Sequence, residues 1–221
     1  MNDRYVGQRR ALLGTMQERG IRDLNVLRAF DTVHRHEFIP EAVRHRSYED
    51  APVPIGFGQT ASQPSLQALY MQVLELKPSD RVLEIGTGCG FQTAVLAQLA
   101  DRVYSVERIR ELGVRAREKL DALRMSNVAI LVGDGTIGWS RYAPYDAILV
   151  AAGGPEIPRP LLEQMADGGR MLIPVGGRDM QQLVLVTRRG DDYEQRPVTD
   201  CTFVPLLGRF GWSTEAPPGQ R

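Results

Sequence analysis

Two stripes of apolar residues at helical spacing open the chain, Leu12, Leu13 and Met16 followed by Leu24, Leu27, Phe30 and Val33. Gly20 lies between the stripes, at a position where a helix commonly ends. The prolines and glycines of "APVPIGFGQT" then break regular structure. We therefore predict that residues 1–62 form a helical N-terminal region and a loop, packed on the main domain.

The pattern becomes helical again at Pro64, with Ser62 or Gln63 as the predicted N-cap. Short apolar runs then alternate with helical stripes over residues 91–99, 108–124 and "RPLLEQMA". The predicted strands are "RVLEIG", "RVYSVE", "VAILVGD", "YDAILVAA", "GRMLIPVG", "QQLVLVTRR" and a last segment over 198–207. Continuous apolar strands alternating with helices predict a doubly wound α/β domain over 63–212 with a mostly parallel sheet. Because no helix precedes the last segment, we predict an antiparallel C-terminal edge, followed by a disordered tail at 213–221.

Charge and cysteine content narrow the possible partners. Lys+Arg and Asp+Glu both number 27, so no long-range attraction to nucleic acid or an anionic membrane is expected. No apolar run approaches the roughly 18 residues of a membrane span, and the charged N-terminus does not read as a secretory signal. Two cysteines are too few for a disulfide framework. We expect a cytoplasmic monomer without a nucleic-acid or membrane partner.

The clearest chemical motif is a glycine-rich turn, "VLEIGTGCGFQTA", between a predicted strand and a predicted helix. Gly86, Gly88 and Gly90 permit a tight turn and let a ligand approach the backbone at a helix N-terminus. The spacing is G-x-G-x-G, and bulky Phe91 stands where a dinucleotide fingerprint requires its third glycine. The lysine and Ser/Thr of a triphosphate-binding loop are also absent. The motif therefore favours a nucleoside ligand other than NAD or a nucleoside triphosphate.

Three acids accompany this turn. Glu107 closes the second strand, where it can accept hydrogen bonds from a ribose diol, and Asp134 closes the third, where it can bind an adenine amino group. Glu84 lies inside the first strand, beneath the turn, and could help to hold a cationic amine. For any one of these acids alone, a helix cap or a surface charge is the better explanation. Together they fit a cationic nucleoside such as S-adenosylmethionine.

Several segments carry a family resemblance: "IGFGQTASQP", "VLEIGTGCGFQTAVLA", "VYSVERI", "VGDG", "APYDAILVAA", "IPRPLLEQMADGGRMLIPVG" and "FVPL". The chain resembles the protein-L-isoaspartate O-methyltransferases from about residue 5 to 212. The resemblance implies a Rossmann-like class I S-adenosylmethionine-dependent methyltransferase fold. It also implies methyl transfer to the free α-carboxylate of L-isoaspartyl residues in damaged proteins, which starts repair through a succinimide. D-aspartyl residues are a candidate second substrate.

The resemblance also implies roles for individual residues. Ser62 is assigned the active-site role. The cofactor-binding residues would be Gln59, Thr60, Ala61, Gln67, Glu84, Gly86, Gly88, Gly90, Glu107, Asp134 and Gly135. The substrate-binding residues would be Thr60, Ser62, Val150, Ala151 and Leu207. Gln67 stands where some members have histidine, and Leu207 where some have threonine.

Carboxyl methylation makes modest demands on side-chain chemistry. A carboxylate with a pKa of about 4 is already an anion at pH 7, so its attack on a sulfonium methyl needs alignment rather than a general base. His34, His36 and His45 lie outside acid–base or metal-ligand spacing, and we predict no metal. The hydroxyls of Thr60 and Ser62 can donate to the acceptor carboxylate. Helix capping is the competing explanation for Ser62.

Two other functions remain open from the sequence. One is an S-adenosylmethionine-dependent carboxyl methyltransferase that acts on another peptide or a small-molecule acid. The other is a catalytically silent relative that binds nucleoside and serves as a partner module. The intact glycine turn, Glu107 and Asp134 argue against the silent relative.

Overall fold

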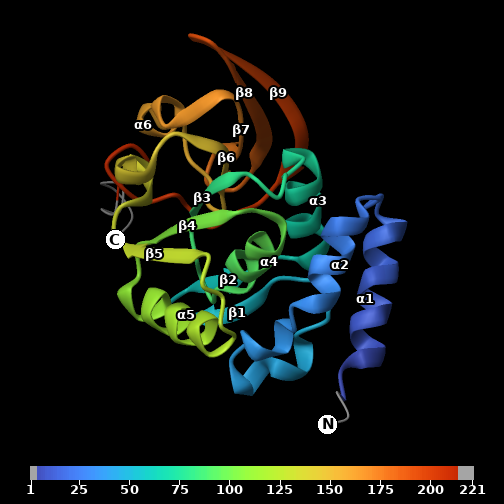
Figure 1. Cartoon of the computed structure of the whole chain (residues 1–221). Helices are drawn as coiled ribbons and strands as arrows, with labels where there is room; N and C mark the ends of the chain where they lie inside the picture. Colours follow the sequence, from blue (N-terminus) through green and yellow to red (C-terminus); the bar gives the residue numbers. More distant parts are fainter. Residues whose placement is uncertain (1–3, 214–221) are drawn as a thin grey trace.

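The computed structural model describes residues 4–213, and a seven-stranded sheet forms its centre (Figure 1). The strand order is β5-β4-β3-β6-β7-β8-β9. The parallel part consists of β3 (Arg81–Ile85), β4 (Arg102–Glu107), β5 (Val128–Val132), β6 (Tyr145–Val150) and β7 (Met165–Gly176). Strand order reverses between β3 and β6, which places a crevice at their carboxyl ends. The predicted doubly wound sheet is confirmed.

The C-terminal edge is antiparallel, as predicted, but its last strand lies earlier in the chain. β8 (Gln181–Arg189) pairs with β7 and with β9 (Asp192–Cys201). The prediction of a strand over 198–207 was therefore wrong beyond Cys201. Most of β9 is exposed, so its charged residues need no apolar alternation that a sequence pattern could reveal. Past Cys201 the Gln181 side chain accepts the Phe203 N–H at 2.8 Å and draws the segment inward.

The N-terminal region begins with α1 (Val6–Glu18) and α2 (Leu24–Thr32), where helices were predicted. After Thr32 the helical prediction fails, because the chain forms only the short 3₁₀ segments η1 (Arg35–Glu37) and η2 (Glu41–Arg46). Pro40 lies between them, and a proline restricts the residue before it and has no N–H to donate. α1 and α2 stand beside α3 (Pro64–Leu74) in Figure 1. Met16 and Phe30 share a hydrophobic cluster with Phe91 of α4 (Phe91–Leu99).

A hairpin connects this region to α3. Its strands are β1 (Val53–Gly56) and β2 (Gln59–Ala61), with Val53 opposite Ala61. At the tip Gly56, Phe57 and Gly58 all have positive φ, of 94°, 54° and 68°. Two glycines supply this conformation without steric cost, and the reversal carries Gln59 to Ser62 back toward the sheet.

The central strands of the sheet are buried on both faces, as expected from their continuous apolar runs. Val82 of β3 packs in one cluster with Leu96 of α4 and Leu120 of α5 (Arg110–Ala122), whereas Leu83 packs in the other. The second face is covered by α6 (Arg159–Glu163), η3 (Gly135–Ile137), η4 (Ser140–Tyr142) and an aromatic group around Tyr104. α6 is shorter than "RPLLEQMA" suggested because β7 already starts at Met165. Within residues 4–213, none of the helices is long and apolar enough to cross a bilayer. The predicted disordered tail lies almost wholly beyond the described residues.

Candidate active site

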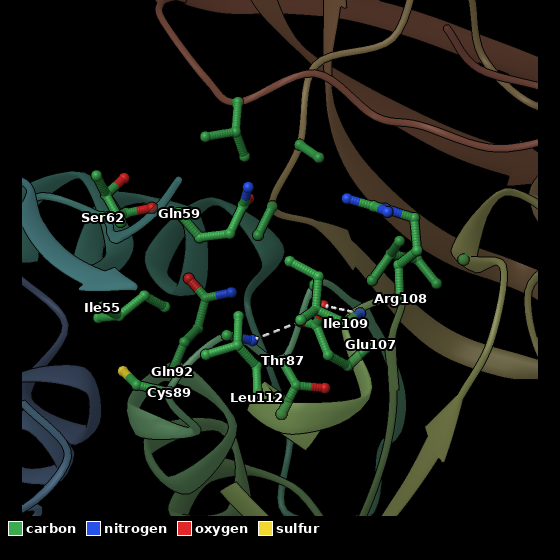
Figure 2. A pocket seen from close by; sticks show the side chains of 18 of the residues that line it. Ile55, Gln59, Ser62, Thr87, Cys89, Gln92, Glu107, Arg108, Ile109 and Leu112 are labelled. Carbon is green, nitrogen blue, oxygen red and sulfur yellow. Dashed lines mark hydrogen bonds between the residues drawn. The ribbon is translucent and has the colours of Figure 1, made fainter. Parts of the chain in front are cut away.

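A cavity lies between the hairpin and the carboxyl ends of the central strands. Figure 2 shows Ile55, Gln59 and Ser62 facing Glu107 and Arg108 across it. The sequence-predicted residues that line this cavity are Gln59, Thr60, Ala61, Ser62, Gln67, Gly86, Gly88, Glu107, Gly135, Ala151 and Leu207. The fold thus brings the hydroxyl-bearing hairpin and the glycine turn to a single space.

Glu107 ties the glycine turn to the next strand. It is only 6% exposed, and one carboxylate oxygen accepts the Gly88 N–H while the other accepts the Ile109 N–H, both at 2.8 Å (Figure 2). Each oxygen keeps a second lone pair for another donor. A buried acid at this strand end can therefore hold the turn and still accept hydrogen bonds from vicinal hydroxyls.

The glycines keep this side of the cavity open. Gly86, Gly88 and Gly90 have φ values of 97°, 55° and 87°, which side chains other than glycine rarely adopt. A Cβ on Gly135 would lie 2.4 Å from Cγ2 of Ile85, too close without a shift of the backbone or of Ile85. Close approach of a ligand to the backbone is possible at Gly86, Gly88 and Gly135, which line the cavity without a side chain.

Four predicted residues do not line the cavity: Glu84, Gly90, Asp134 and Val150. Gly90 is the N-cap of α4 and faces Ala116 of α5, to which a Cβ would come within 3.1 Å. Val150 points into the second hydrophobic cluster. Alternate residues of a strand face opposite sides of the sheet. A position near the end of a strand was therefore not enough to predict that the side chain faces the cavity.

Glu84 lies beneath the turn, as predicted, but its carboxylate does not reach the cavity. It is fully buried and accepts hydrogen bonds from Gln92 Nε2, Thr93 Oγ1 and Ser105 Oγ at 3.0, 2.5 and 2.6 Å. Burial raises the pKa of Glu84 to about 7, against the opposing effect of these donors. Direct contact with a cationic amine, expected from the sequence, has no place in this geometry, because Gln92 stands between Glu84 and the cavity.

Asp134 lies next to the cavity but does not line it. Its Oδ1 accepts the Thr136 N–H and hydroxyl, and its Oδ2 accepts the Arg209 N–H at 2.8 Å. The carboxylate thereby fastens η3 to the C-terminal segment that brings Leu207 to the cavity. Its predicted contact with an adenine amino group stays a prediction.

Ser62 is not a helix cap. Gln63 occupies the N-cap of α3 without a side-chain bond, and the Ser65 N–H is accepted instead by Oδ1 of Asp50, at 2.9 Å. The prediction of an N-cap at Gln63 is confirmed, and the alternative at Ser62 is wrong. Ser62 is half-buried and lines the cavity beside Thr60. Its hydroxyl has no capping function in this structure and faces the space shared with the glycine turn.

Sequence reasoning missed several lining residues. Arg108 and Ile109 follow Glu107 directly, and the first turn of α4 presents the polar side chain of Gln92. "FVPL" was noted only as a motif, yet Val204, Pro205 and Leu206 line the cavity. Thr87 and Cys89 lie within the glycine motif itself, and burial raises the pKa of the Cys89 thiol, so it stays protonated.

The histidine prediction needs a correction. The structure brings ligand atoms of His34, His36 and Glu37 within 4.8 Å of one another, although their sequence spacing suggested no metal-binding group. The 3₁₀ turn at Arg35–Glu37 folds these neighbours together. Nδ1 of His36 is 2.8 Å from the Tyr48 hydroxyl, and its ring stacks on Tyr5. These contacts give the group an ordinary packing role.

A doubly wound sheet with a G-x-G-x-G turn at its switch point and an acid ending the next strand defines a Rossmann-like nucleoside-binding domain. The sequence pattern of the family "Protein-L-isoaspartate(D-aspartate) O-methyltransferase (PCMT)" matches residues 7–211. The chain belongs to this family.

Relatives and solved structures agree with that assignment. A protein-L-isoaspartate O-methyltransferase from Syntrophus aciditrophicus is 49% identical over 96% of this chain and 100% of its own length. One from Geobacter metallireducens is also 49% identical, over 95% and 98%. A solved protein-L-isoaspartate O-methyltransferase superposes with a TM-score of 0.83 at 30% identity, covering 92% of this chain and 67% of its own. One from Plasmodium falciparum, in complex with S-adenosyl-L-homocysteine, gives 0.78 at 27%, covering 89% and 97%.

Proposed function

We propose that the chain transfers a methyl group from S-adenosylmethionine to the free α-carboxylate of L-isoaspartyl residues in damaged proteins, and so starts their repair through a succinimide. The observation that carries this proposal is a single cavity bounded by Glu107 and the glycine turn on one side and by Thr60 and Ser62 on the other. Family membership supplies the reaction class, and the cavity supplies a place for donor and acceptor together.

The residues present fit the donor. Glu107 offers two buried oxygens with free lone pairs, and Gly86 and Gly135 let a nucleoside lie against the backbone. When bound, S-adenosylmethionine supplies an electrophilic methyl on a sulfonium. No metal is needed for this chemistry.

The remaining work is orientation of the acceptor. An isoaspartyl carboxylate is ionised at neutral pH and needs no base to remove a proton. Thr60 and Ser62 both line the cavity, which supports a role for their hydroxyls as donors to it. Neutral donors orient the anion without fully suppressing its nucleophilicity. Ala151 and Leu207 line the cavity from the sheet edge and the C-terminal segment, where they can bound the acceptor chain. Alignment of this kind is worth roughly 7–11 kcal/mol of barrier.

Four finer points belong to the same proposal. We infer that damaged proteins and peptides carrying isoaspartyl residues are the partners, with D-aspartyl residues as a second substrate. We infer further that the enzyme acts as a monomer in the cytoplasm. The low number of cysteines, two, supports this location.

The test is incubation with methyl-labelled S-adenosylmethionine and two peptides that differ only in Asp or isoAsp at one position. Base-labile label on the isoAsp peptide alone is expected. Equal label on both peptides would show a general carboxyl methyltransferase. Absence of label on both, from protein that binds S-adenosylhomocysteine, would point to a different acceptor.

A further inference from the structure

Arg35 is a buried cation in the N-terminal region. The residue is 1% exposed, and among residues 4–213 its guanidinium forms no ion pair. Burial lowers the pKa of Arg35 to about 10, so the group is still charged at neutral pH. Burying a charge without a carboxylate partner is costly, and its hydrogen bonds must offset that cost.

Those hydrogen bonds go to the junction between hairpin and helix. Nη2 donates to the Ser62 carbonyl at 2.9 Å and to the Ala61 carbonyl at 3.5 Å, and Nη1 donates to Oε1 of Gln67 at 2.9 Å. The guanidinium carbon also lies 4.9 Å from the centre of the Phe91 ring. One rigid group therefore holds the end of β2, the Ser62 main chain and the first turn of α3.

The contact continues inward through two amides. Nε2 of Gln67 donates to Oε1 of Gln92 at 3.2 Å, and Nε2 of Gln92 donates to Oε1 of Glu84 at 3.0 Å. A guanidinium can only donate, and the Glu84 oxygen that faces Gln92 accepts. Because these groups stand at opposite ends, both amides are held in one orientation, oxygen toward Arg35 and nitrogen toward Glu84. Gln67 and Gln92 both line the cavity.

We propose that Arg35 is a positioning residue for methyl transfer, which clamps the Ser62 backbone and, through Gln67 and Gln92, fixes the hairpin to the strand beneath the glycine turn. This inference rests on the proposed function, since positioning has meaning only for an acceptor held at Ser62. Arg35 does not line the cavity and acts through the residues it holds.

The experiment compares Arg35→Lys and Arg35→Met with Arg46→Met, which removes a partly exposed arginine paired with Glu49 in the same region. Three quantities are measured: kcat and KM on the isoAsp peptide, S-adenosylhomocysteine affinity by calorimetry, and amide hydrogen exchange. For Arg35→Lys we expect kcat to fall about tenfold or more, because small misplacements of reacting groups are costly in rate. Exchange over residues 59–67 should quicken, whereas affinity should stay within about threefold of the wild type and Arg46→Met should change nothing.

Unchanged exchange over residues 59–67 in a folded Arg35 variant would overturn the proposal, and so would unchanged kcat. Gln67→Met provides a second test of the proposal if both Arg35 variants fail to fold. It breaks the relay while leaving the Arg35–Ser62 contact, so faster exchange in the 59–67 segment with lowered kcat supports the relay, and unchanged values overturn it. A wild type that leaves the isoAsp peptide unlabelled refutes the proposed function, and exchange still decides whether Arg35 clamps the hairpin.

Discussion

Asp50 caps α3 through Ser65, accepting the Ser65 N–H on Oδ1 and the Ser65 hydroxyl on Oδ2, both at 2.9 Å. The same carboxylate accepts Nε2 of Gln63 and pairs with Arg19 at 2.8 Å. The cap thus comes from the segment before the hairpin and not from the hydroxyl next to the helix. This relation separates the capping role from Ser62, so stability and activity can be tested at different residues.

Replacing Ser62 by alanine should therefore impair turnover without weakening the fold. We expect kcat on the isoAsp peptide to fall about tenfold or more, since an orienting donor is lost. The free energy of unfolding should stay within about 0.5 kcal/mol of the wild type. Denaturant titration beside steady-state kinetics measures both.

Asp50→Ala is the matched control for that variant. It removes the true cap, so a loss of about 1 kcal/mol or more in unfolding free energy is expected. If Ser62→Ala lost as much stability as Asp50→Ala and kept its turnover, Ser62 would be a structural residue only.

Gly135→Ala should damage the floor of the cavity. The new methyl would lie 2.4 Å from Cγ2 of Ile85, a buried β-branched side chain with little freedom to move. Overpacking of this kind costs about 1–3 kcal/mol, and we expect S-adenosylhomocysteine affinity to fall with it. Gly133→Ala is the control, because its methyl would meet nothing closer than 3.8 Å. The affinities are measured by calorimetry. Equal affinities of the two variants would show that ligand binding does not require the absence of a side chain at Gly135.

The sequence predicted those parts of the fold where burial leaves a periodic mark. β4 and α4 were predicted with the bounds observed. Both elements pack in the core, so their buried positions are apolar and mark where each element begins and ends. β9 was not predicted because it is an exposed edge strand. The turns after Thr32 were predicted as helix because the apolar spacing was followed past Pro40, the residue that interrupts a helix there. β9 is held by backbone pairing with β8, from Arg189 opposite Asp192 onward, and this pairing needs no apolar pattern.

The residues of the site likewise fall into those that the sequence could predict and those that it could not. Glu107 and the glycine turn could be placed because strand ends of a parallel sheet meet at one edge. Glu84 was misplaced toward the ligand because side-chain direction depends on Gln92, Thr93 and Ser105, none of which a strand pattern specifies. Arg35 has no signal at all in a single sequence, since an arginine in a polar segment reads as exposed.

Glu107→Gln should loosen the glycine turn and weaken donor binding. Both carboxylate oxygens accept backbone N–H groups, from Gly88 and Ile109, and an amide can accept only one while it presents N–H groups to the other. An unsatisfied buried donor costs about 1–3 kcal/mol, so S-adenosylhomocysteine affinity should fall about tenfold or more. Glu111→Gln, an exposed change in the first turn of α5, should leave affinity unchanged. An affinity within about twofold of the wild type for Glu107→Gln would contradict this role.

Glu84 should make stability fall as pH rises through neutrality. Burial raises its pKa from 4.5 to about 7 in the folded protein, so between those pH values the folded state binds more protons than the unfolded state. The free energy of unfolding then decreases with rising pH, by an amount on the order of 3 kcal/mol at most for a shift of this size.

Glu84→Gln isolates this contribution. Its oxygen can still accept from Gln92, and its amide can donate to the hydroxyls of Thr93 and Ser105, which rotate to accept. Urea titrations of both proteins at pH 5 and pH 8 measure the difference. We expect the wild type to lose more stability than the variant between these values, because only the wild type must ionise a buried group. A loss of equal size in both proteins would mean that the Glu84 carboxyl does not change its protonation over this range, and that its donors alone hold it as the anion.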